Sequence, residues 1–148
     1  MTEMSPNEQK LNDFLVEVFH DILRLEESSL RKSCGNLSVA ELHVLDVISR
    51  CAVPCGMADI ATALHVTAGT ATVAIKTLEQ KEYVVRTRHQ TDRRRVCVQL
   101  TEKAYPVLAH HQTFHTKLVR AAAQGLSEEE LNALCKALAR LHCHFSTL

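Results

Sequence analysis

The sequence predicts a mostly α-helical protein with one small β-hairpin. Only four Gly and three Pro occur in 148 residues, and apolar residues make up 46%, so long helices around a real core are favoured. Apolar residues recur at three- and four-residue spacing through most of the chain and alternate only near residues 83–100. We therefore expect one domain, 1–148, in which strands at 83–88 and 96–100 interrupt a series of helices.

The N-terminal part of the chain predicts two helices separated by a short break. An apolar stripe covers residues 7–32, and Gly35 with Asn36 is expected to end that helix. Ser38, followed three residues later by Glu41, forms a capping box that opens the second helix. The inward residues expected in this helix are Leu42, Leu45, Val47 and Ile48.

The next segment has the spacing of a helix-turn-helix. A short apolar helix is expected at 57–64, a turn at 65–67, and a second helix at 68–81 capped by Thr67. Small hydroxyl-bearing residues on the outer face let such a helix enter the DNA major groove, although an ordinary helical hairpin is the alternative for this stretch alone. The residues expected to contact DNA here are Thr67, Ala68, Thr70, Ala71, Thr72, Lys76 and Thr77.

The hairpin that follows has the position of a wing, with a solvated loop as the alternative for its tip. From Lys76 to Arg95, seven basic and three acidic residues give a local charge of +4, although the whole chain has a net charge of zero. A basic patch on an otherwise acidic chain is typical of a polyanion-binding surface, and tip arginines suit a narrow minor groove. The wing residues expected at DNA are Arg86, Arg88, Asp92, Arg93, Arg94 and Arg95, with Asp92 bracing a neighbouring arginine.

Two C-terminal helices complete the predicted fold. Thr101 is expected to cap a helix that runs to about residue 124, and a second capping box, Ser127 with Glu130, opens the last helix. The last helix carries a narrow apolar seam that requires a partner helix, and the first helix offers a matching stripe. We therefore expect a homodimer formed by 1–36 and 102–148 around a DNA-binding part at 37–101. Its interface is expected to include Leu11, Phe14, Leu15, Leu131, Leu134, Leu138, Leu141 and Phe145.

In this order of elements the chain resembles the MarR family of winged helix-turn-helix regulators over almost its whole length. The residues that carry the resemblance are Asp92-Arg93-Arg94 and the run from Val96 to Lys103. The resemblance implies a triangular homodimer, a pseudo-palindromic double-stranded operator, a recognition helix at 68–81 and a wing that enters the minor groove. It also implies that Asp92 is the wing brace and that Arg94 is the minor-groove arginine.

Within the family, the chain is most similar to the fatty-acid-synthesis repressors of Gram-positive bacteria. The similar stretches are 37–43, 46–48, 66–67, 69–70, 114–115 and 125–130. This resemblance implies a repressor of fatty-acid biosynthesis genes. It also implies that long-chain acyl groups on acyl carrier protein increase the affinity of the repressor for DNA. The acyl chain is expected among the first, second and fifth helices, and no cofactor is expected to be required.

A second branch, the zinc-uptake repressors, provides the alternative effector. Its metal site uses one Glu and three His, which at matching positions of this chain are Glu27, His43, His111 and His115. His111 and His115 are four residues apart on one helical face, which suits two imidazoles on a single zinc ion. Histidines on partly buried helix faces also form ordinary hydrogen bonds, so the structural interpretation stays open beside the metal site.

Other classes of protein are disfavoured by the sequence. The His111–His115 pair lacks the Glu of a metalloprotease helix, and no phosphate-binding loop or nucleophile motif is present, so an enzyme is not expected. No apolar run approaches the ~20 residues of a membrane span, and no secretory signal is recognised, so we expect a cytoplasmic protein. The six cysteines are expected to act as small apolar side chains, with thiol sensing through Cys34 as a further alternative.

Overall fold

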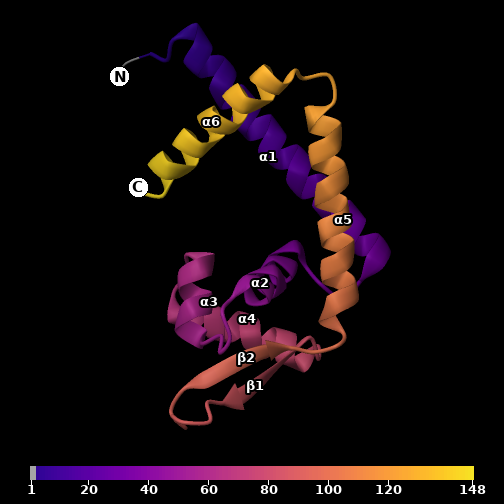
Figure 1. Ribbon diagram of the computed structural model, residues 1–148, viewed down its shortest axis with the longest axis vertical. Helices are drawn as coiled ribbons and strands as arrows, with labels where there is room; N and C mark the ends of the chain where they lie inside the picture. Colours follow the sequence, from indigo (N-terminus) through magenta and orange to yellow (C-terminus); the bar gives the residue numbers. More distant parts are fainter. Residues whose placement is uncertain (1–2) are drawn as a thin grey trace. The chain divides into compact units, whose positions relative to one another are not determined.

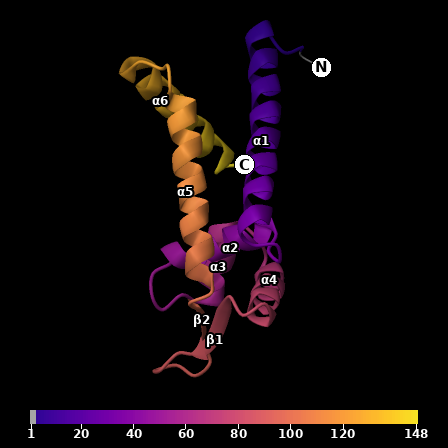
Figure 2. The same ribbon diagram turned by 90° about the vertical axis from the view of Figure 1, so that its right-hand side faces the viewer.

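The computed structural model describes residues 3–148, and within them six helices and one antiparallel hairpin are present (Figures 1 and 2). This confirms the mostly α fold with a hairpin wing. The strands pair in register from Val84 opposite Leu100 to Arg88 opposite Val96. In chain order the elements are α1 (Pro6–Ser33), α2 (Val39–Arg50), α3 (Met57–Leu64), α4 (Ala68–Gln80), β1 (Val84–Arg88), β2 (Val96–Leu100), α5 (Ala104–Ala123) and α6 (Glu128–Phe145).

Local capping explains where several helices begin. Both predicted capping boxes are present, at Ser38 with Glu41 and at Ser127 with Glu130, and a further one at Ser5 opens α1. Each satisfies backbone N–H groups that a helix start leaves without partners. The predicted cap at Thr101 is wrong, because α5 begins at Ala104 and the Thr101 hydroxyl instead donates to the Glu82 carbonyl at 2.7 Å.

The chain divides into two compact units within α5. The first ends at Gln112 and contains α1 with the winged part, and the second comprises Thr113–Leu148. The core of the first unit lies where α2, α3, α4 and the hairpin meet, and most of its side chains are apolar. Its most deeply buried large side chains are Leu45, Ile60, Ile75, Leu78, Tyr83, Val84 and Val98. The core therefore fixes α4 and the wing against the same set of side chains.

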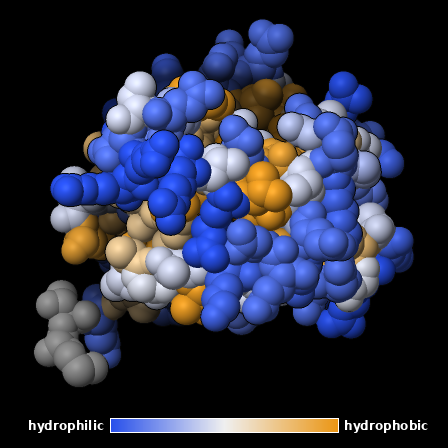
Figure 3. All heavy atoms as spheres, turned by 90° about the horizontal axis from the view of Figure 1, so that it is seen from below, coloured by the Kyte–Doolittle hydropathy of each residue, from blue (hydrophilic) through white to orange (hydrophobic). Residues whose placement is uncertain are grey.

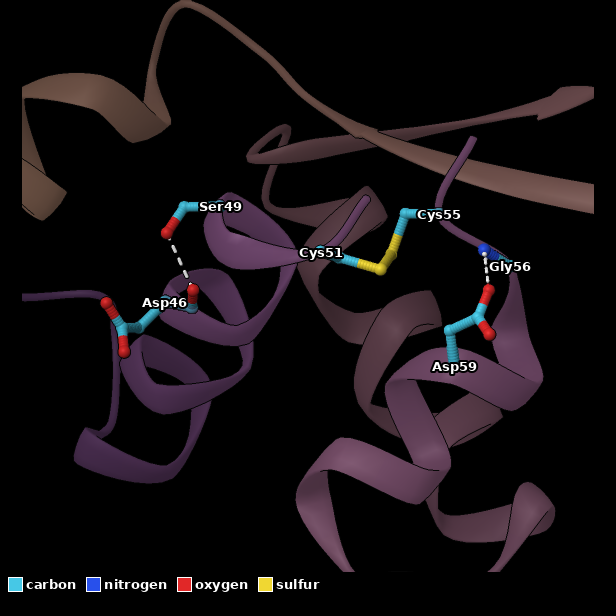
Figure 4. The surroundings of a disulfide bond; sticks show 6 residues. All are labelled: Asp46, Ser49, Cys51, Cys55, Gly56 and Asp59. Carbon is cyan, nitrogen blue, oxygen red and sulfur yellow. Dashed lines mark hydrogen bonds between the residues drawn. A yellow bond between two sulfur atoms is a disulfide. The ribbon is translucent and has the colours of Figure 1, made fainter. Parts of the chain in front are cut away.

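A disulfide bond joins Cys51, at the end of α2, to Cys55, just before α3 (Figure 4). It corrects the expectation that all the cysteines serve only as apolar side chains, because the turn between α2 and α3 brings these two Cα atoms to 5.7 Å. The Cys55 carbonyl accepts a hydrogen bond from the Val98 N–H at 2.8 Å, and Gly56 pairs with Cys97 in an isolated bridge. The disulfide therefore secures the segment against which β2 of the wing docks.

Candidate nucleic-acid interface

Helices α3 and α4 form the predicted helix-turn-helix. They are bent by 108° to one another, within the range of such motifs, and only three residues separate them. His65 adopts a left-handed conformation with φ 53°, which reverses the chain, and the Thr67 hydroxyl caps α4 by accepting from the Thr70 N–H at 3.2 Å. The helix that would face DNA therefore starts at the predicted residue.

The buried face of α4 corrects one predicted DNA contact. Ala71, Ile75 and Leu78 are completely buried, with relative exposures of 0%. Ala71 therefore packs in the core and cannot contact DNA, because it lies on the same helical face as Ile75 and Leu78. The remaining predicted residues of this region are exposed, apart from the half-buried Thr77.

The hydroxyl groups on α4 are largely used within the helix. The Thr72 hydroxyl donates to the Ala68 carbonyl at 2.9 Å, and the Thr77 hydroxyl donates to the Val73 carbonyl at 3.0 Å. Val73 itself is 66% exposed and was not among the residues predicted to contact DNA. Its position two residues from both Ala71 and Ile75 places it opposite the core, and that helical phase was the signal in the sequence that would have identified it.

The wing tip is ordered by main-chain hydrogen bonds. The Asp92 carboxylate accepts from the Arg94 N–H at 3.0 Å, while the Arg95 N–H donates to the Asp92 carbonyl at the same distance. The His89 N–H donates to the Arg95 carbonyl at 2.9 Å and closes the loop. Asp92 is thus a brace of the kind expected, acting through the backbone of Arg94 and leaving its guanidinium exposed.

The arginines of the wing differ in how they are engaged. Arg93, Arg94 and Arg95 are exposed at the tip, whereas Arg86 forms a salt bridge with Glu79 of α4 at 2.7 Å. Hydrogen bonding to Arg86 lowers the pKa of Glu79, so this pair stays charged and connects the wing to α4. Seen from below, the molecule presents a mostly hydrophilic face with small apolar areas between the polar side chains (Figure 3). The tip therefore carries three exposed positive charges, and Glu79 holds Arg86 nearer the base of the wing.

A polar cluster ties the loop after α1 to the end of α4. Lys81 donates to the Asn36 carbonyl at 2.5 Å and to the Glu41 carboxylate at 2.9 Å. Burial alone would raise the pKa of Glu41, but the hydrogen bonds and charge of Lys81, with the Ser38 cap, outweigh it and lower that pKa. These contacts join the loop after α1 directly to the end of α4.

Tyr83 extends this cluster to the single cysteine of the same loop. Its hydroxyl lies 2.7 Å from the Cys34 sulfur and donates to the Asn36 side-chain oxygen at 2.8 Å, while the Lys103 ammonium lies 4.7 Å from its ring centroid. Burial, followed by the hydrogen bond with Cys34, raises the pKa of Tyr83 to about 12. The hydroxyl therefore remains protonated at neutral pH and keeps donating to Asn36.

Away from the DNA-facing elements, α1, α2 and α5 meet at a buried carboxylate. Glu26 is only 4% exposed, and its Oε1 lies 3.2 Å from Nε2 of His43 and 3.9 Å from Nδ1 of His111. The two imidazole rings are 5.9 Å apart between centroids. A carboxylate between two imidazoles can hold a proton, a hydrogen-bond network or a metal ion.

The structure does not bring every predicted metal ligand to this cluster. Glu27 is exposed and forms a salt bridge with Arg31 at 3.1 Å, so Glu26 takes the place that the sequence assigned to Glu27. His115 lies one turn beyond His111 along the continuous helix α5. His110 is on a different face, where its Nε2 lies 2.9 Å from the Ser29 hydroxyl.

The residues predicted at the dimer interface are exposed in the single chain. On α1, the relative exposures are 45% for Leu11, 63% for Phe14 and 40% for Leu15. On α6, which has no buried residue, they range from 37% to 54% for Leu131, Leu134, Leu138 and Phe145, while Leu141 is half-buried. Each helix therefore carries an apolar row that its own unit leaves exposed.

No single helix among residues 3–148 is long and apolar enough to cross a membrane. Helices α3 and α4 are long and apolar enough only if they are counted together, although a sharp bend separates them. Helices that are buried in a protein core commonly have the same length and composition. Ile60, Ala61, Ala71, Ile75 and Leu78 of this pair are buried in the core.

The sequence model of the MarR family matches residues 37–96, which include the helix-turn-helix and most of the wing. A search of curated proteins found no significant match.

Solved structures match over the whole length of the chain. FabT of Streptococcus pneumoniae, in a complex with DNA, is 34% identical over 95% of this chain and 98% of its own, with a TM-score of 0.87. The regulator BldR of Sulfolobus solfataricus is 28% identical over 93% and 99%, with a TM-score of 0.64. MepR of S. aureus, also bound to DNA, is 20% identical over 99% and 100%, with a TM-score of 0.78, and shows the shared fold.

Proposed function

Because this chain belongs to the MarR family of DNA-binding transcriptional regulators, which are not enzymes, we propose that it represses fatty-acid biosynthesis genes in response to long-chain acyl groups. The observation that carries the proposal is the 34% identity with S. pneumoniae FabT over 95% of the chain. This similarity includes the helices outside the DNA-binding part, where an effector would act. The acyl group would be presented on acyl carrier protein.

The proposed acyl site is the junction of α1, α2 and α5. Ligand binding there would act on DNA affinity through two contacts of the first unit. The loop after α1 reaches the end of α4 through Lys81, and the end of α2 reaches the wing through the Cys51–Cys55 segment. An effector that favours the DNA-binding arrangement must itself bind more tightly in the presence of operator, because such coupling is reciprocal.

We further propose that the chain acts as a homodimer, as is typical of the family. The apolar rows of α1 and α6 are the surfaces that a second copy would cover. A dimer would present two copies of α4 to successive major grooves of a pseudo-palindromic operator, about one helical turn apart.

Zinc is a second candidate effector, and the Glu26 cluster is the observation that favours it. In a tetrahedral zinc site with bonds of ~2.0–2.1 Å, neighbouring ligand atoms are about 3.3 Å apart. The Glu26 oxygen lies 3.2 Å from His43, which matches this spacing, and 3.9 Å from His111, which is longer. A zinc-responsive protein of this family would then control zinc-uptake genes.

Operator binding measured by fluorescence anisotropy distinguishes the two effectors. The probe is a labelled duplex from the promoter of a fatty-acid-synthesis gene, titrated with protein in chelator, in zinc, and with long-chain acyl carrier protein. We expect acyl carrier protein to tighten binding by about tenfold, within the usual range of allosteric coupling, and chelator to have no effect. Carrier protein without an acyl chain is the control for direct protein contacts.

Two histidine variants distinguish regulation by acyl groups from regulation by zinc. His111→Ala removes a member of the Glu26 cluster, whereas His110→Ala removes the neighbouring imidazole on another face and serves as the matched control. DNA binding that requires zinc and is lost only in His111→Ala would replace the acyl proposal with zinc regulation. No response to acyl carrier protein in any condition would contradict the acyl proposal.

A further inference from the structure

The outermost residue of the recognition helix is apolar. Successive residues of an α-helix are rotated by ~100°, so Val73 points away from both Ala71 and Ile75, which are fully buried. With 66% of its surface exposed, Val73 occupies the middle of the face that α4 offers to DNA. Within this helix, it is the large apolar side chain that the core does not use.

The neighbours of Val73 leave it prominent and offer few hydrogen-bond donors. Gly69, one turn earlier, has no side chain, and a Cβ there would meet only the Thr67 hydroxyl at 4.0 Å. The hydroxyls of Thr72 and Thr77 already donate to main-chain carbonyls of α4. Their hydroxyl oxygens can therefore only accept from a base, and beside them these threonines present methyl groups. Lys76 is the nearby charged side chain on this face.

We propose that Val73 is a specificity-determining residue that reads thymine C5-methyl groups in the operator. The thymine methyl is the one apolar group that base pairs present in the major groove, and a buried apolar contact selects it without hydrogen bonds. Val73 and the methyl groups of the two flanking threonines form an apolar surface suited to this contact. Recognition by α4 then depends on where thymines lie, while Lys76 and the wing arginines supply the charge.

Replacing thymine with deoxyuridine tests the proposal, because it removes only the methyl group. The probe is a duplex selected from random-sequence DNA by the native protein, with its thymines replaced one at a time. At one thymine in each half-site we expect the loss of the methyl to weaken binding about fourfold, the equivalent of one buried methyl-sized group. Val73→Ala removes two such groups from each copy of the dimer, four in all, so it should bind the unmodified duplex about 200-fold more weakly.

The decisive result is the combination of the two changes. In Val73→Ala, deoxyuridine at those positions should have no further effect, because the partner of the methyl is already absent. Val119→Ala, the same change on a helix at a valine of 63% exposure outside the DNA-binding part, should retain the native response. Native affinity for Val73→Ala, or a deoxyuridine effect of unchanged size in that variant, would overturn the proposal. Unchanged circular dichroism of both variants verifies that they fold.

Discussion

Leu138→Glu is expected to dissociate the proposed homodimer. Leu138 is 51% exposed in the single chain and lies in the middle of the apolar row on α6. In the dimer the change would remove a buried leucine, worth about 1.5–3 kcal/mol, from each copy and place a carboxylate without a partner in the interface. We expect the dissociation constant of the dimer to rise at least about a hundredfold, measured by sedimentation equilibrium.

Lys136→Glu is the matched control for this variant. Lys136 is exposed on α6 two residues before Leu138, which places it on the opposite side of the helix. The Lys136→Glu protein should remain dimeric, although it gains the same carboxylate. If Leu138→Glu sediments as a dimer at the concentrations where the native protein does, the row on α6 is not the interface.

Arg94→Ala is expected to weaken operator binding and reduce the preference for A·T-rich flanking sequence. Its main chain is fixed by Asp92, and its side chain is exposed at the tip of the wing. A narrow A·T-rich minor groove concentrates negative potential, so an inserted guanidinium binds such flanks more strongly than G·C-rich ones. The loss of a base-reading arginine costs about 1–3 kcal/mol, or roughly five- to 150-fold in affinity. Anisotropy titrations on duplexes with A·T and G·C flanks measure both effects.

Two variants of the same loop give the comparison for Arg94. Arg93→Ala removes an equal charge, and if that residue contacts phosphate, affinity should fall equally for both flanks. Asp92→Ala keeps all three arginines and removes only the acceptor of the Arg94 N–H, so it should lose part of the preference. An Arg94→Ala protein that is weaker by the same factor on both duplexes would show that Arg94 contacts only the backbone.

The sequence identified most of the fold because its signals are local. Ser38 and Ser127 each lie three residues before a glutamate, and both begin a helix as predicted. The alternation at 84–88 and 96–100 likewise formed the hairpin. Such patterns depend on contacts within a few residues and therefore need no knowledge of tertiary packing.

The candidate sites were less predictable because they depend on helical phase and on distant partners. Glu26 and Glu27 differ by one position, and only packing against His43 and His111 distinguishes the buried carboxylate from the exposed one. The prediction that Ala71 contacts DNA, and the omission of Val73, have the same cause. The many small residues of α4 do not show which face is buried, and only the packed structure places Ala71 in the core and leaves Val73 exposed. The Cys51–Cys55 bond required the geometry of the turn between α2 and α3.

A hydroxyl-radical footprint of the native protein on its selected duplex tests most directly whether α4 and the wing of a dimer recognise DNA. We predict two protected segments related by two-fold symmetry, with centres about one helical turn apart, and protected minor grooves on both flanks. In Arg94→Ala the flanking protection should disappear while the central segments remain. A single unsymmetrical footprint, or flanks that stay protected in Arg94→Ala, would contradict this account of recognition.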